Sequence, residues 1–116
     1  KQHMAKLIES GSVHTVVDLH GMAAHHGLDV CIGIGDDTHD ETIALLCRLL
    51  DTAGLSWAVN KPFAGRGSGT VRTSARAAGA AAMQLEIGPK CRNPLAAPEQ
   101  TVALLSTLSK FAQSLS

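Results

Sequence analysis

The chain has 116 residues, which is enough for one domain with a hydrophobic core. Ten basic side chains balance ten acidic ones, so no excess of positive charge indicates a nucleic acid or an anionic membrane as a partner. No apolar run approaches the roughly 20 residues of a membrane span, and the chain does not start like a signal peptide, so we expect a cytoplasmic protein.

Apolar residues recur with the spacings of strands and helices in alternation. β-branched apolar runs predict strands, and apolar residues at every third or fourth position predict helices. In chain order, the predicted elements are the end of a helix over residues 4–9, strands over 13–19 and 29–34, a helix from a cap at Thr38 or Asp40 to Gly54, a strand over 56–60, a strand over 83–87 and a closing helix from Pro98.

Three segments between these elements carry a different pattern. The glycine-rich residues 61–69 and the residues 90–97 are predicted loops. The alanine-rich residues 74–82 are ambiguous, because alanine favours a helix while Gly79 argues against a long one.

The alternation predicts a single α/β domain over residues 1–116, with a mostly parallel or mixed sheet and helices on both faces. Ligands of such sheets bind at the carboxyl ends of the strands, where we expect to find His20, Asn60 and Glu86. The three cysteines contain no Cys-x-x-Cys pair and are predicted to be buried free thiols in a reducing compartment.

Asp18 and His20 stand at the end of the first predicted strand. Residues i and i+2 of an extended strand share a face, so Asp18 can support a histidine whose ring binds a metal or a substrate. A solvated loop pair has the same pattern, so both interpretations stay open.

Glu86 lies in or at the end of an otherwise apolar strand, two residues after Gln84. Burying a carboxylate without a partner is costly, so this position indicates a metal-bound water, an arginine or a proton as the partner. The alternative is that Glu86 lies on a solvent-exposed edge.

The stretch from Asn60 to Arg66 is a predicted loop, and Arg72 and Arg76 follow it. Glycines let a backbone approach a ligand, and a guanidinium binds a carboxylate with two hydrogen bonds. The sequence contains no P-loop signature, and Gly33-x-Gly35 lacks the third glycine of a dinucleotide fingerprint. These features favour a carboxylate-bearing ligand over a nucleotide.

Four of these segments follow one another in a set order: Asp18-x-His20-Gly, Ile32-Gly-Ile-Gly35, Asn60-x-Pro-Phe-x-Gly65 and Gln84-x-Glu86. This succession resembles the N-formylglutamate amidohydrolase family, which shows a similar order of an Asp-x-His pair, a glycine-ended strand, an Asn-x-Pro-Phe-x-Gly loop and a Gln-x-Glu strand. The order and spacing carry the resemblance. It implies a zinc carboxypeptidase-like fold with a mixed sheet between helices.

The resemblance also implies a metal-dependent amidohydrolase, which cleaves an amide or peptide-like bond in a small carboxylate-bearing substrate. It makes His20 the last of three protein ligands of Zn²⁺, with Asp18 behind it. It makes Glu86 the general base that moves a proton from the attacking water to the leaving amine. The substrate contacts that it implies are Asn60, Arg72 and Arg66.

Related zinc enzymes take a His and a Glu from a region before the Asp-x-His strand. His3 and Glu9 are six positions apart on a predicted helix, which is a poor spacing for metal ligands. We therefore expect the chain to be the C-terminal portion of an amidohydrolase-like domain, with further ligands on an upstream segment or a companion chain. The alternative is a non-catalytic binding or structural subunit that keeps the fold without a complete metal site.

Overall fold

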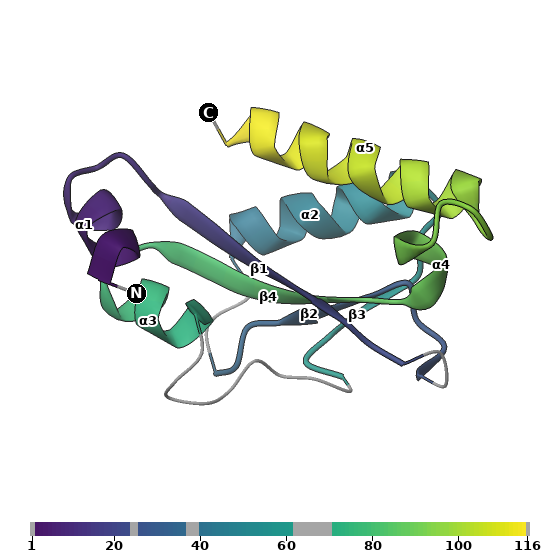
Figure 1. The fold of residues 1–116 in the computed structure, drawn as a ribbon. Coiled ribbons are helices and arrows are strands. Elements are labelled where there is room, and N and C mark those ends of the chain that lie inside the picture. The colour runs from purple at the N-terminus through teal and green to yellow at the C-terminus, as the bar shows by residue number, and fades with distance from the viewer. Residues whose placement is uncertain (1, 24–25, 37–39, 62–70, 116) are drawn as a thin grey trace.

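The structure is a computed structural model that describes residues 2–23, 26–36, 40–61 and 71–115. Figure 1 shows the course of the chain. Its elements are α1 (Gln2–Glu9), β1 (Thr15–Gly21), β2 (Val30–Gly33), α2 (Glu41–Thr52), β3 (Trp57–Val59), α3 (Val71–Ala77), β4 (Ala81–Ile87), α4 (Pro89–Arg92) and α5 (Pro98–Ser114).

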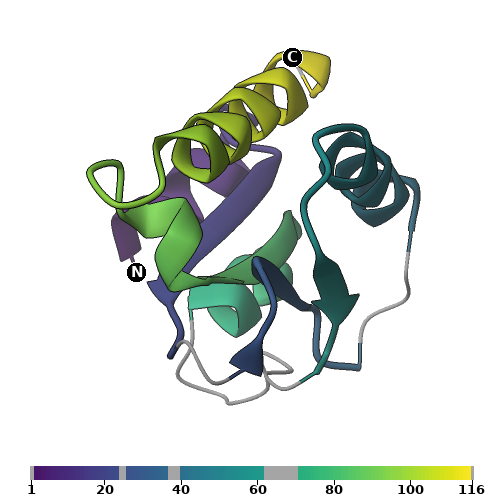
Figure 2. The ribbon, with the colours of Figure 1, turned by 90° about the vertical axis from the view of Figure 1, so that its right-hand side faces the viewer.

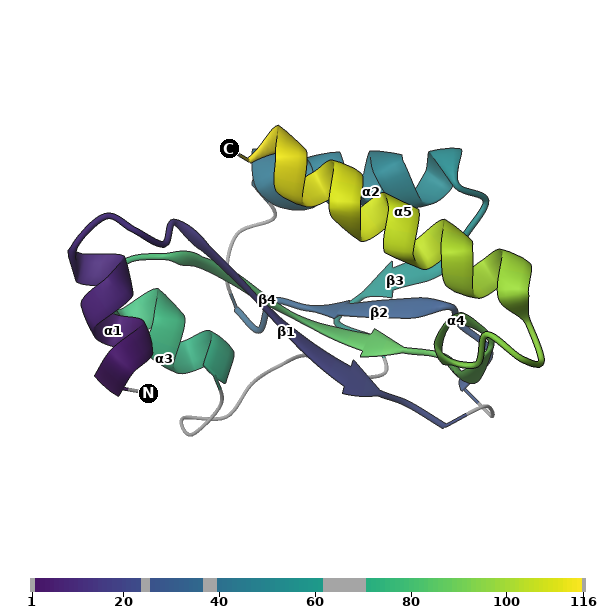
Figure 3. The ribbon, with the colours of Figure 1, turned by 45° about the horizontal axis from the view of Figure 1, so that its top comes forward.

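The described strands form a four-stranded sheet in the order β1-β4-β2-β3. β1 runs parallel to β4, and β2 runs parallel to β3, but β2 and β4 are antiparallel. Helices α2 and α5 lie on one face of the sheet, while α3 packs against the other face near the amino ends of β1 and β4, with α1 beside it (Figures 1 and 3). The predicted α/β fold with a mixed sheet and helices on both faces is therefore confirmed.

The main hydrophobic core lies between the sheet and the pair of helices α2 and α5. Asp40 caps the N-terminus of α2, where its carboxylate accepts a hydrogen bond from the Ile43 backbone N–H (3.1 Å). Its apolar residues repeat at helical spacing and so face the sheet together. The largest side chains with no exposed surface in this core include Ile32, Ile43, Leu46, Leu50, Met83 and Leu85.

A smaller apolar cluster joins α1 and α3 to the sheet. It contains Ile8, Ala75, Ala80 and Ala82, with Val16 packed against it. Alanine side chains let α3 approach β4 closely. This cluster occupies the amino halves of β1 and β4, so the residues further along the same face stand beyond it.

The alanine-rich segment contains both a helix and a strand. Helix α3 ends at Ala77, and β4 begins at Ala81. Gly79 has a φ of +101°, a conformation that glycine adopts without strain and that turns the chain between them. The predicted loop over residues 90–97 is wrong in its first part, because Pro89–Arg92 forms the single turn α4.

No helix among the described residues is long and apolar enough to cross a membrane.

The three cysteines are buried free thiols, as predicted. Burial raises the pKa of Cys91 to about 11 from its ordinary 9.0, and the nearby Asp29 carboxylate adds to the rise.

Stability should therefore fall at alkaline pH. The folded chain holds the Cys91 proton more tightly than the unfolded chain, so its contribution is complete below pH 9.0 and is lost as the pH rises towards about 11. Urea unfolding at stepped pH values measures this, and Cys91→Ser should show a smaller decline over the window. An identical decline in both proteins would contradict the assignment.

Replacing Gly88 by any larger residue should destabilise the folded chain. Its backbone N–H donates to the Asp29 carbonyl (2.8 Å), and a Cβ at this position would overlap the carbonyl oxygen of Leu28. We expect Gly88→Ala to cost about 1–3 kcal/mol of folding free energy, because the backbone must shift to relieve the overlap. An unchanged melting temperature would show that this contact is not tight.

Candidate functional site

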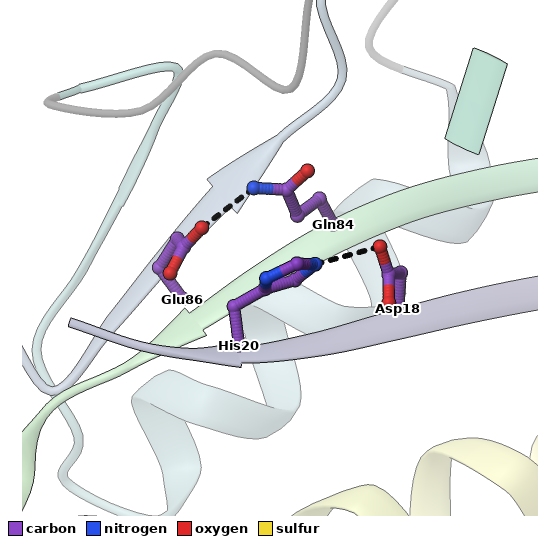
Figure 4. A network of polar contacts seen from close by, with 4 residues as sticks. All are labelled: Asp18, His20, Gln84 and Glu86. Atoms are coloured by element: carbon purple, nitrogen blue, oxygen red, sulfur yellow. Dashed lines mark hydrogen bonds and ion pairs between the residues drawn. The ribbon is translucent and has the colours of Figure 1, made fainter. Parts of the chain in front are cut away.

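Two neighbouring strands present four polar side chains on one face of the sheet. In the parallel pair β1·β4, Asp18 lies opposite Gln84, and His20 lies opposite Glu86. Residues two apart on a strand share a face, so both pairs point the same way. Figure 4 shows the four side chains together. The structure thus brings His20 and Glu86 next to each other, as the candidate site requires.

The imidazole of His20 is held by Asp18. The Nε2–H of His20 donates to Oδ2 of Asp18 at 2.7 Å. This hydrogen bond raises the pKa of His20 above its ordinary 6.5, and the negative charges of Asp18 and Glu86 act in the same direction against partial burial. The other ring nitrogen, Nδ1, takes no part in this bond. The histidine side chain remains 47% exposed, so a ligand can reach it.

The carboxylate of Glu86 is buried, with 7% of the residue exposed. Among the described residues it accepts one hydrogen bond, from Nε2 of Gln84 to Oε1, at 2.6 Å. A buried carboxylate with so few partners is costly unless another group binds it. This burial excludes the alternative that Glu86 lies on a solvent-exposed edge.

Gln84 is the residue whose role the sequence analysis missed. It supports Glu86 from two residues earlier on the same strand, just as Asp18 supports His20. The Gln-x-Glu spacing carried that signal, because i and i+2 side chains of a strand are neighbours. Each strand therefore contributes one candidate site residue and the residue that orients it.

Asn60 follows β3, and its side chain holds the backbone just after the end of β2. Its backbone is left-handed (φ 61°), its Oδ1 accepts the Ile34 backbone N–H (2.9 Å), and its Nδ2 donates to the Gly35 carbonyl (2.7 Å). Because β3 runs with β2 and against β4, its carboxyl end points away from that of β4. Strand direction therefore does not place Asn60 beside His20 and Glu86.

Arg72 reaches the same short segment from α3. The residue is buried, with 5% exposed, and its Nη1 donates to the Ile34 carbonyl at 3.2 Å. Asn60 and Arg72 thus both form hydrogen bonds with backbone groups of the turn at Ile34 and Gly35. Gly33, the residue before Ile34, lies opposite Gln84 in the β2·β4 register, so this turn borders the polar row. Arg66 lies outside the described residues.

The hydrogen-bonded pair Asp18 and His20 fits the role of one metal ligand with its supporting carboxylate. A histidine that binds a metal usually donates its other N–H to a carboxylate, and the Asp18–His20 bond has this form. Zinc in a catalytic site takes three protein ligands. Within the described ranges, no group of three or more His, Cys, Asp or Glu side chains is arranged to hold a metal ion.

The electrostatics of this row can be tested by titration. We expect Asp18→Asn to lower the pKa of His20 more than Glu86→Gln does, because the Asp18 hydrogen bond is the largest cause of the rise and Glu86 acts by charge alone. The ¹H NMR shifts of the imidazole measure this. Glu9→Gln on α1 is the control and should leave the titration unchanged, and an equal effect of all three variants would refute the geometry.

The family model of N-formylglutamate amidohydrolase matches residues 1–91. No curated protein sequence matches the chain significantly.

A solved structure has a similar fold. It is the N-formylglutamate amidohydrolase from Ralstonia eutropha JMP134, with a TM-score of 0.63 and 22% sequence identity. The match covers 97% of this chain and 50% of that protein, so the chain spans half the length of the solved enzyme. At this identity the likeness concerns the fold.

Proposed function

The chain belongs to the N-formylglutamate amidohydrolase family, and on this basis we propose that it contributes His20 and Glu86 to the active site of a zinc-dependent amidohydrolase. The proposed substrate is a small carboxylate-bearing molecule with an amide or peptide-like bond. The observation that supports the proposal most directly is the pairing of His20 with Glu86 on one face of β1 and β4.

In this proposal His20 is one protein ligand of Zn²⁺. Asp18 orients the ring through Nε2, which leaves Nδ1 as the ligating nitrogen. A bound zinc ion would supply Lewis-acid chemistry for a carbonyl or a water molecule. The further ligands come from an upstream segment or a companion chain. Because Asp18 raises the pKa of His20, protons compete with the metal as the pH falls.

Glu86 is the proposed general base. Its carboxylate accepts a proton from the attacking water and transfers it to the leaving amine, so that the amide is cleaved to a carboxylate and an amine. Gln84 occupies Oε1 and leaves Oε2 outside that hydrogen bond.

The proposed substrate contacts are Asn60, Arg72 and Arg66. Asn60 and Arg72 hold the turn at Ile34 that borders the polar row. In this proposal the guanidinium of Arg72 or Arg66 binds the substrate carboxylate through two parallel hydrogen bonds, for which its planar geometry is suited. Removing the side chain of Asn60 or of Arg72 should therefore raise KM more than it lowers kcat.

Hydrolysis of N-formyl-L-glutamate by the purified chain, with any polypeptide that co-purifies, tests the roles of the two residues. Glu86→Gln should retain zinc and lose about 10²- to 10⁴-fold in turnover, the usual contribution of a general base. His20→Ala should lose both zinc and turnover. Metal content is measured on the same samples, and Glu9→Gln on α1 is the control with unchanged values.

The outcome that contradicts the proposal is equally definite. If His20→Ala leaves the metal content unchanged, or if Glu86→Gln turns over like the wild type, the assigned roles are wrong. A sample that binds no divalent metal, and whose melting temperature does not change with EDTA, identifies instead a binding or structural subunit. A metal bound only by the folded chain must raise that temperature.

A further inference from the structure

A groove lies between α2 and α5, on the side of these helices that faces away from the sheet. Its volume is about 580 Å³. Figure 2 shows the two helices together above the sheet. The groove is lined by Leu49, Thr52 and Ala53 of α2 and by Pro98, Glu99, Val102, Ala103, Ser106, Thr107 and Lys110 of α5.

The α5 side of the groove is an exposed stripe. Glu99, Val102, Ser106 and Lys110 are all exposed and recur every three or four residues, so they lie along one side of the helix. Val102 is 63% exposed. This stripe therefore combines an exposed valine with an acidic residue at one end and a basic residue at the other.

The order of residues in the stripe is self-complementary. If a second α5 packs antiparallel, with a twofold axis between Leu104 and Leu105, Glu99 lies opposite Lys110 of the other copy. The same axis places Ala103 opposite Ser106. These are four of the seven α5 residues that line the groove. The small side chains meet at the centre, where the helices must approach most closely, and opposite charges meet at both ends.

We propose that this face of α5 is the interface on which a second copy of the chain docks, antiparallel and with twofold symmetry. A twofold interface uses the same surface on both copies, so each must be complementary to itself. The charge order along α5 meets this condition, whereas a parallel arrangement places Glu99 against Glu99 and Lys110 against Lys110. The inference does not depend on the proposed hydrolase activity, because α5 carries none of its residues.

Charge and apolar contact contribute differently to such a dimer. An exposed ion pair adds little to affinity, and salt screens it. The exposed Val102 and the small side chains of the stripe therefore supply most of the affinity, and the two symmetric ion pairs select the antiparallel direction. We expect a dimer that forms at micromolar to millimolar concentration and that weakens as the salt concentration rises.

Charge reversal tests the pairing directly. Glu99→Lys or Lys110→Glu alone places like charges opposite each other at both ends and should raise the dimer Kd about tenfold or more. The double variant Glu99→Lys/Lys110→Glu restores opposite charges and should return Kd to within about threefold of the wild type. Sedimentation equilibrium over a range of protein and salt concentrations measures these values for the whole chain.

Controls separate docking from folding. Glu9→Lys on α1 changes the net charge as Glu99→Lys does, and it should leave the dimer unchanged. Val102→Ser should weaken the dimer while melting remains within the range of the other variants, since this side chain is exposed. A wild type that is monomeric at every concentration overturns the proposal, and so does a dimer that the single reversals leave intact or that the double variant fails to restore. Such results would assign the groove to a different partner.

Discussion

The parallel pairing of β1 with β4 positions everything that this site contains. Its register sets His20 opposite Glu86 and Asp18 opposite Gln84, so two residues far apart in the sequence share one patch of the sheet. Backbone hydrogen bonds hold this register along seven residues of each strand. If one strand shifted by one residue, both of its polar side chains would turn to the opposite face, where the main core lies. The geometry of the site is thus a property of the strand pair.

Each strand of this pair repeats the same local device. A residue that can accept or donate a hydrogen bond stands two positions before the functional side chain and orients it. Asp18 affects the charge of His20, whereas Gln84 holds a carboxylate oxygen without adding charge. The two supports therefore leave a basic nitrogen and a carboxylate side by side, which is the arrangement that proton transfer near a metal or a polar substrate requires.

The match with the solved relative covers half of that protein, and within the described ranges no group of three or more His, Cys, Asp or Glu side chains could hold a metal ion. The geometry of His20, Glu86 and their supports is well defined, because these residues lie on regular strands that the core behind them holds in place. The turn at Ile34, fastened by Asn60 and Arg72, forms the border of this patch. Helix α5 lies on the opposite face of the sheet, and the interface proposed there shares no residue with the patch.

The sequence by itself determined the elements and the local pairs. Helical and strand spacing predicted nearly all elements, and the i, i+2 rule predicted that Asp18 faces His20, because both depend on neighbours along the chain. Only the tertiary structure decided that β4 runs parallel to β1 and antiparallel to β2. Strand direction depends on contacts between distant segments, and no local pattern records it. For that reason the meeting of His20 with Glu86 needed the fold, and the turning of Asn60 towards β2 could not be predicted.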